Sequence, residues 1–423
     1  MFLIQVPPQP STPLTGLRLF MTGLQQNRNL DSWIREYGHS VAVTLVLLVG
    51  LGPPMVAQEL PAGSVIEVSG VPTCQTCEIQ FSHVVRLGST DGKDAIWTPP
   101  YNVIRIGTDY ILVSETDDGR LLLYDTAGNI LDVFDRKGGG PEEVEDLATI
   151  ARLGSTTVAI LDWGNSRFSI IEAGSGKIEV VRTVRITDKL PGKIWSYDES
   201  NLIGYDEYAG WKEGTREAAL QIYHLDESEA RISASFDVVS TRVLPDVQRQ
   251  RTVWADESHV WSSSLGEYLI RRWGLDGTPD GAFRFRPEWF SGKVEGALGP
   301  PSRPPDPLVN SLWTDDDGQL WVFTWRPSNA YKQAWEGLSE LIRNGELMGS
   351  GRPAYHKMWN TNIDVIDPET GELVTSRMWI SLVGGVLGDG FIWTQWQDEF
   401  GVPRVDIWRI SMVTGERTGR RMP

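Results

Sequence analysis

Residues 109–134, DYILVSETDDGRLLLYDTAGNILDVF, carry the clearest indication of the fold. They contain three short apolar segments that are separated by the runs TDDG and DTAGN. Segments of this length are too short for helices, and their β-branched and aromatic residues favour strands. Gly, Asp and Asn tolerate the backbone angles of the tight turns that join antiparallel strands. The stretch therefore predicts an antiparallel meander.

The same pattern of short apolar segments and turns recurs along the chain. Segments resembling 109–115 occur at 156–163, 200–206, 258–264, 318–325 and 389–396. Each is followed by a hairpin candidate, at 120–134, 167–181, 219–233, 268–285, 362–376 and 405–419. A further strand candidate precedes each segment, beginning with NVIRI at 102–106. Four strands repeated six times predict an all-β, six-bladed β-propeller with four-stranded antiparallel blades.

The lengths of the connections divide the expected propeller into two faces. In such a blade, the second-to-third and blade-to-blade connections share one face, and they hold the long segments 135–146, 207–217, 286–307 and 326–359. We call this the long-loop face and expect function there, since loops on a rigid scaffold commonly carry it. Within the last segment, residues 329–344 have the periodicity of one short amphipathic helix. This helix either covers the propeller mouth or packs on blade edges.

The N-terminal part predicts an export signal. Residues 41–52 are uncharged and apolar but shorter than the about 20 residues that a spanning helix needs. Small and proline residues follow, as in a signal peptide. We expect residues 1–58 to be a targeting segment and the protein to be secreted or periplasmic in a bacterial envelope; an uncleaved anchor is the alternative. No later segment is long and apolar enough to span a membrane.

Residues 59–95 form the next expected region, ahead of a propeller at 96–423. We expect a strand at 79–89 to close the ring by pairing with residues 403–419. Cys74 and Cys77 form a C-x-x-C pair that we expect to be a structural disulfide in an oxidising compartment. A redox dithiol and a metal site are the alternatives.

The net charge of the chain limits the classes of molecule that it is expected to bind. Lys and Arg total 39 against 56 Asp and Glu, a formal net charge of -17. So acidic a chain disfavours nucleic acid and anionic lipid surfaces. We expect a monomer that binds a protein, a small molecule or a carbohydrate.

The pattern resembles secreted bacterial six-bladed propellers of the NHL-repeat type. The resemblance is carried by 123–144 (LYDTAGNILDVFDRKGGGPEEV), 162–172 (DWGNSRFSIIE) and 315–323 (DDDGQLWVF). The family includes protein-binding scaffolds, lactonases and lyases, so the resemblance implies a fold and does not select a function.

Aromatic residues are the most unusual feature of the composition, with 18 Trp. Those on strands, namely Trp163, Trp261, Trp321, Trp325 and Trp393, are expected to pack between blades together with Phe323. The turn Asp315–Gly318 is interpreted as a capped turn before a buried strand, because no calcium loop follows it.

Two functional hypotheses follow. The first is a non-catalytic binding module whose long-loop face takes a ligand or partner through Arg136, Tyr208, Trp211, Arg326, Tyr331, Trp335 and His356. It needs no cofactor and no metal. The alternative is a metal-dependent, lactonase-like hydrolase or lyase with a cation such as Ca²⁺ in the central channel. Its candidate ligands are Asp162, Asn165, Asp206, Asp256 and Asp389, which turn capping explains equally well. No motif identifies a catalytic residue, so enzymatic activity stays open.

Overall fold

The chain divides into two compact units, Met1–Pro54 and Met55–Pro423. The computed structural model describes residues 65–89, 92, 95–116, 118–212, 215–241, 250–290, 304–343, 355–398 and 401–414, all within the second unit. Side chains are described for these residues except 207–217, 239–241, 338–343 and 355–356. The expected signal peptide lies outside the described residues. No helix among those described is long and apolar enough to span a membrane.

The described part is all-β apart from two helices, and its strands form five sheets. One sheet contains β3 (Asn102–Ile106), β4 (Tyr110–Glu115), β5 (Arg120–Asp125) and β6 (Ile130–Phe134), paired antiparallel in chain order. This sheet is the meander predicted from residues 109–134 together with the strand ahead of it. Asp125 forms the last turn, where its Oδ1 accepts hydrogen bonds from the backbone amides of Ala127 and Asn129.

The next sheet has eight strands and consists of two such antiparallel runs. The first run is β7 (Leu147–Arg152), β8 (Thr157–Asp162), β9 (Arg167–Glu172) and β10 (Glu179–Ile186). The second run is β11 (Lys193–Ser196), β12 (Asn201–Lys212), β13 (Thr215–Leu225) and β14 (Glu229–Thr241). The outer strands β10 and β14 join the two runs by a short parallel pairing, so that one sheet holds both.

Two further sheets follow the same order. One contains β15 (Arg251–Ala255), β16 (His259–Ser264), β17 (Leu269–Gly274) and β18 (Pro279–Arg284), to which β1 (Val65–Glu67) adds a parallel edge strand that the sequence did not predict. The other contains β19 (Leu308–Thr314), β20 (Leu320–Pro327), β21 (Trp359–Asp367) and β22 (Glu372–Trp379). Helices α3 (Tyr331–Arg343) and α4 (Tyr355–Met358) lie in the connection from β20 to β21.

The last sheet confirms the closing strand. β23 (Val383–Gly388), β24 (Phe391–Gln397) and β25 (Pro403–Thr414) are followed in space by the N-terminal strand β2 (Cys77–Leu87), which pairs antiparallel along β25. The hairpin expected at 405–419 is therefore wrong: β25 is one continuous strand through Thr414, because β2 takes the place of the fourth strand. Cys74 and Cys77 form a disulfide at the start of β2.

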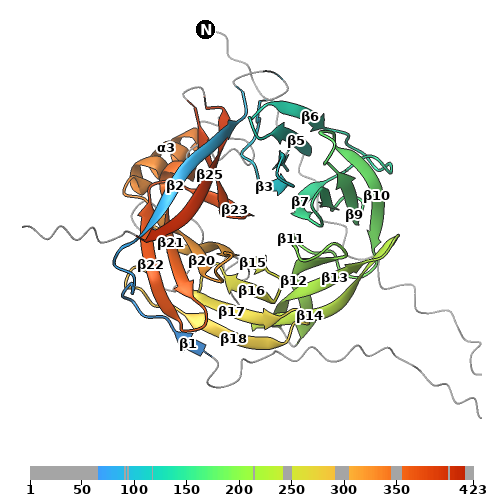
Figure 1. Cartoon of the computed structure of the whole chain (residues 1–423). Coiled ribbons are helices and arrows are strands. Elements are labelled where there is room, and N and C mark those ends of the chain that lie inside the picture. Colours follow the sequence, from blue (N-terminus) through green and yellow to red (C-terminus); the bar gives the residue numbers. More distant parts are fainter. Residues whose placement is uncertain are drawn as a thin grey trace, which may run out of the picture. The chain divides into compact units, whose positions relative to one another are not determined.

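The sheets are arranged in a propeller-like ring (Figure 1). The first strands β3, β7, β11, β15, β19 and β23 contact one another in cyclic order, and β23 contacts β3 again. Buried side chains fill the wedges between successive sheets. One cluster, for example, joins Leu87, Trp393 and Val405 to Val113 and Tyr124 across the point of closure. Burial of such apolar surface is the main force that holds the sheets together.

Helix α3 confirms the helix predicted at 329–344. Its residues Tyr331 and Ala334 are buried against Leu308, Trp359 and Leu382 of the neighbouring strands and connections. The described part of the helix therefore packs on the starts of strands β19 and β21 and on the connection into β23. The long connections after β6, β18 and β20 follow the second or fourth strand of a run, as expected for the long-loop face. The connection expected at 207–217 is wrong: residues 207–212 belong to β12 and residues 215–217 to β13, which pair with each other as an extended hairpin.

Candidate functional site

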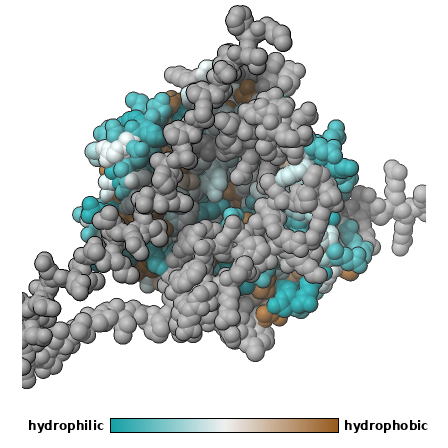
Figure 2. Space-filling model, turned by 180° about the vertical axis from the view of Figure 1, so that it is seen from behind, coloured by the Kyte–Doolittle hydropathy of each residue, from teal (hydrophilic) through white to brown (hydrophobic). Residues whose placement is uncertain are grey.

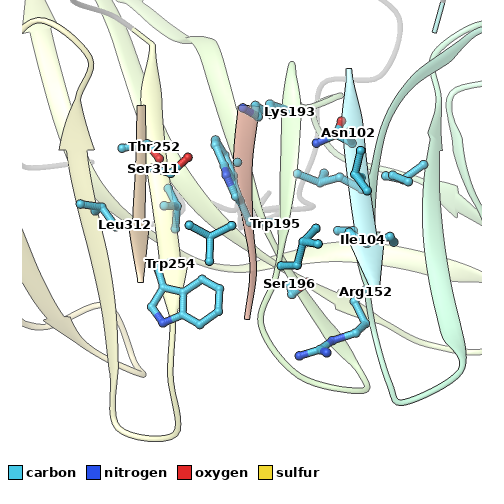
Figure 3. A pocket seen from close by; sticks show the side chains of 18 of the residues that line it. Asn102, Ile104, Arg152, Lys193, Trp195, Ser196, Thr252, Trp254, Ser311 and Leu312 are labelled. Atoms are coloured by element: carbon cyan, nitrogen blue, oxygen red, sulfur yellow. The ribbon is translucent and has the colours of Figure 1, made fainter. Parts of the chain in front are cut away.

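A cavity of about 260 Å³ lies between the innermost strands β3, β7, β11, β15, β19 and β23 (Figure 3). A single ordered water molecule needs a cavity of only roughly 10–15 Å³. Ligand pockets commonly begin at about 300 Å³, and this cavity is close to that lower limit. The cavity is therefore of a size for a small organic molecule. Viewed from behind, the surface is hollowed near its middle, and hydrophilic residues are visible at the floor (Figure 2).

The cavity has two different ends. Asn102, Lys193 and Thr252 gather at one end, and Arg152 and Trp254 lie at the other (Figure 3). Asn102 and Lys193 are the first residues of β3 and β11, so their end is the one that the long connections reach. We call it the long-loop end. Side chains alternate along a strand, and this places every second residue of these short strands in the cavity wall.

Hydrogen-bond donors are concentrated at the long-loop end. The Thr149 hydroxyl donates to Asn102 Oδ1 at 3.1 Å, which leaves the Asn102 Nδ2 group as the donor that the amide can offer. Asn310 Nδ2 donates to Ser311 Oγ at 2.9 Å, so the Ser311 hydroxyl hydrogen is available to another acceptor. Thr252 adds a further hydroxyl. The end of the cavity thus favours a ligand group that accepts hydrogen bonds.

Lys193 is the cation at this end. Its ammonium lies 5.8 Å from the ring centre of Tyr101 and 5.2 Å from that of Trp195, and both rings line the cavity. These distances are within the range of cation–π attraction, which holds the ammonium between the rings. Trp163 Nε1 donates to the carbonyl oxygen of Pro191 at 2.8 Å and fixes the loop that leads into Lys193. Within the described part of the chain, no carboxylate pairs with Lys193.

The charge of the cavity is opposite to that of the chain. Lys193, Arg105 and Arg152 line it, and no Asp or Glu is among its described lining residues. Arg105 is paired with Asp389, with 3.1 Å between Nη1 and Oδ2. The Arg152 side chain has no hydrogen bond or ion pair with any described residue, whereas its backbone pairs with Val158 in the sheet. The electrostatic potential in this cavity is therefore expected to be positive, whereas the protein as a whole has a net charge of -17.

Carboxylates near the long-loop end are neutralised by their own partners. Glu115 is fully buried at the end of β4 and lies 3.1 Å from the Arg120 guanidinium. Burial raises the pKa of Glu115, although Arg120 and the amides of Thr98 and Trp97 act in the opposite direction. Asp162 lies at the equivalent end of β8, 3.2 Å from Arg167. These acids are paired at strand ends and are not among the residues that line the cavity.

Asp237 forms a buried bridge between β14 and the following sheet. Its Oδ2 accepts hydrogen bonds from Arg251 Nε at 3.0 Å and from Ser262 Oγ at 2.9 Å, and its Oδ1 lies 3.6 Å from Arg271 Nε. Asp237 also has a positive φ of 47°, a conformation that costs energy for residues other than glycine. Arg251 directly precedes Thr252 of the cavity wall, so the bridge fixes the start of β15.

The predicted ligand-binding residues with described side chains, Arg136, Arg326, Tyr331 and Trp335, are not among those that line this cavity. Arg136 pairs with Glu142 at 3.0 Å, in the connection from β6 to β7. Arg326 stacks over the ring of Trp289 at 4.3 Å, and burial lowers the pKa of its guanidinium.

The aromatic members of that set are placed differently. Tyr331 is 1% exposed and stacks with Trp335, a partly buried residue one turn further along α3. The Tyr331 ring is thus part of the packing beneath the helix. Tyr208, Trp211 and His356 have side chains outside the described set. Contact of these seven residues with a ligand stays a prediction.

The candidate metal ligands do not converge among the described residues. Asp206 pairs with Lys189 at 3.4 Å, and Asp256 accepts hydrogen bonds from Trp261 and Thr314. Asp389 is paired with Arg105, as described above. Within the described residues no group of three His, Cys, Asp or Glu is arranged to hold a metal ion. The cavity lining itself offers cations and neutral donors, which do not suit a divalent cation.

Most strand aromatics pack between sheets as predicted. Trp321 and Phe323 are buried in the cluster that joins the sheet of β19–β22 to that of β23–β25. Trp163 is an exception, because 43% of it is exposed, and its packing role was wrong. The Asp315 turn is a capped turn as interpreted: its Oδ1 accepts hydrogen bonds from the amides of Asp317 and Gln319.

Sequence reasoning missed the cavity residues Asn102, Lys193, Trp195 and Thr252. A signal was present, because these residues alternate with buried apolar ones in the first-strand segments NVIRI, GKIWSY and RTVWAD. First strands of a propeller line its channel, so the polar and aromatic positions that alternate with aliphatic ones on these strands could have been predicted to face it.

The chain resembles solved structures in its fold, but its sequence does not match a known family. No family model and no curated protein matches the chain. A member of the DUF4221 family from Bacteroides vulgatus is 10% identical with a TM-score of 0.49 and covers 80% of this chain and 99% of its own. The PQQ-bound aldose sugar dehydrogenase of Streptomyces coelicolor is 11% identical with a TM-score of 0.40 and covers 81% and 100%. The Neurospora crassa Pan2 WD40 domain is 8% identical with a TM-score of 0.38 and covers 78% and 95%. Function is therefore argued from this chain's own residues.

Proposed function

We propose that the chain is an exported six-bladed β-propeller, similar to the NHL type, that binds a small-molecule ligand in its axial cavity. The two antiparallel runs of the eight-stranded sheet count as two blades in this proposal. Export is supported by the apolar segment at 41–52 and by the disulfide Cys74–Cys77, which suits an oxidising compartment.

One observation carries the proposal: the cavity combines an apolar wall with converging hydrogen-bonding groups. Ile104, Trp195 and Leu312 supply the wall, and the long-loop end supplies an ammonium, an amide and hydroxyls. Small-molecule sites usually combine these two elements, apolar contact for affinity and a few polar groups for orientation. No arrangement of nucleophile and base accompanies them in the described lining, which favours binding over catalysis.

The test is a fragment screen by ligand-observed NMR on the full chain, with two tryptophan variants. Trp195→Ala removes the aromatic wall of the cavity. Trp379→Ala is the matched control, because it removes another partly buried tryptophan on the outer strand β22, stacked on Phe81 at 4.3 Å. Fragments that bind the wild type and Trp379→Ala but not Trp195→Ala would support the proposal. Binding that persists in a folded Trp195→Ala protein, or no binding at all, would contradict it.

A further inference from the structure

We infer that the ligand of the axial cavity is an oxyanion, a small carboxylate- or phosphate-bearing molecule whose charged group lies against Lys193. The inference rests on the proposed function and specifies its ligand class.

The first argument is electrostatic. Of the three cations that line the cavity, Arg105 is paired with Asp389, whereas Lys193 has no anionic partner among the described residues. Its ammonium is held between the rings of Tyr101 and Trp195, so it is positioned without being neutralised. Charges of one sign in a cleft with low-dielectric walls raise the local concentration of ligands of the opposite sign. The many acids elsewhere in the chain repel anions, which makes this cavity distinctive.

The neutral groups beside Lys193 are hydrogen-bond donors, which also favours an oxyanion. Asn102 offers Nδ2 because Thr149 occupies its carbonyl oxygen, and Ser311 offers a hydroxyl hydrogen because its oxygen accepts from Asn310. An oxyanion has several lone pairs and accepts from an ammonium and from neutral donors together. A cationic ligand would meet donors and a like charge at the same place.

The third argument concerns the rest of the ligand. Ile104 and Trp195 lie between the two ends of the cavity, with Leu312 on the facing wall (Figure 3). An apolar body seated there would gain from burial while its charged group remains at Lys193. Arg152 lies at the opposite end of the cavity and is the other position at which the anionic group of a ligand could bind.

The experiment pairs each anion with a neutral amide of nearly the same shape. Acetate, phenylacetate and succinate are compared with acetamide, phenylacetamide and succinamide, and inorganic phosphate tests the phosphate source. Binding to the full chain is measured by saturation-transfer NMR and titration. Lys193→Gln removes the charge and retains a donor, and Lys177→Gln is the matched control, because Lys177 lies in the exposed turn between β9 and β10.

We expect at least one anion to bind the wild type and Lys177→Gln more tightly than its amide does. Lys193→Gln should weaken that anion by roughly 10- to 100-fold, the usual effect of losing a hydrogen bond to a charged group. Arg152→Gln should have a smaller effect. Phosphate and carboxylates that compete for one site identify shared recognition of an oxyanion.

Three results would overturn the inference, in distinguishable ways. Amides that bind as well as their acids, and lose binding in Trp195→Ala, would leave the proposed function intact and refute the charge. Anions that respond to Arg152→Gln but not to Lys193→Gln would refute the placement. If no member of the panel binds, the inference and the proposed function both fail.

Discussion

Replacing Asp237 tests how the wall of the cavity is held. Asp237 is 4% exposed and binds Arg251, itself 3% exposed, while Arg271 lies close to its other oxygen. Asp237→Ala would leave the two guanidinium groups without their shared carboxylate. Removing one partner of a buried ion pair typically costs about 3–5 kcal/mol. Arg271 retains its ion pair with Glu267 at 3.3 Å, so the expected loss lies toward the lower end of that range.

The positive φ at this residue gives a second, independent magnitude. Alanine at a φ of 47° keeps the cost of the left-handed conformation, whereas glycine avoids it. Asp237→Gly should therefore be less destabilising than Asp237→Ala by about 1 kcal/mol. Asp237→Asn retains the shape and tolerates this conformation, so its loss of stability reports on the charge.

The assay is urea unfolding at pH 7, followed by tryptophan fluorescence. Asp226→Ala is the control, because that carboxylate is 56% exposed and its contact with His224 is on the surface; we expect no measurable change. The reasoning is refuted if Asp237→Ala loses less than about 1 kcal/mol. It is also refuted if glycine is as harmful as alanine, which would remove the backbone argument.

Two further predictions concern ring closure and pH. Leu87→Ala on the closing strand β2 removes a fully buried side chain and should lower the free energy of unfolding by about 3–5 kcal/mol, whereas Val84→Ala, 45% exposed on the same strand, should cost less than about 0.5 kcal/mol in the same urea assay. Burial raises the pKa of Asp364 above its ordinary value of 3.8, so its stabilising contribution is complete below that value and is lost as the pH rises through the folded pKa. The stability of the wild type relative to Asp364→Asn should therefore fall from about pH 4 upward in urea titrations, and a constant difference would contradict the assignment.

Local patterns predicted the strands well. The segments around 109–115 and 318–325 correspond to β4 and β20, because short apolar runs between Gly and Asp turns have few alternative conformations. The pairing of the N-terminal strand with the C-terminal one was also predictable, since an open ring would leave two unpaired sheet edges. The short edge strand β1 was missed, because three residues carry no clear period.

The candidate site was much less predictable. Loop aromatics such as Tyr331 were predicted to bind the ligand. In the structure, Tyr331 is the first residue of α3 and packs against neighbouring strands. Lys193 was not predicted as a ligand-binding residue, although it alternates with Ile194 on a first strand, because β11 has only four residues. Exposure of a side chain depends on what other segments cover it, and that information is not local.

The all-β class, the order of the strands, the long-loop face and the helix within the long connection could all be predicted from local sequence patterns. These features follow from hydrophobic period and turn chemistry over a few neighbouring residues. The three-dimensional arrangement was needed to see that Asn102, Lys193, Trp195 and Thr252 face one cavity. It was also needed to see that the nearby acids are paired with their own arginines and lysines. The reason is that the cavity forms where six strands far apart in the chain meet, so its charge and shape depend on how the ring closes.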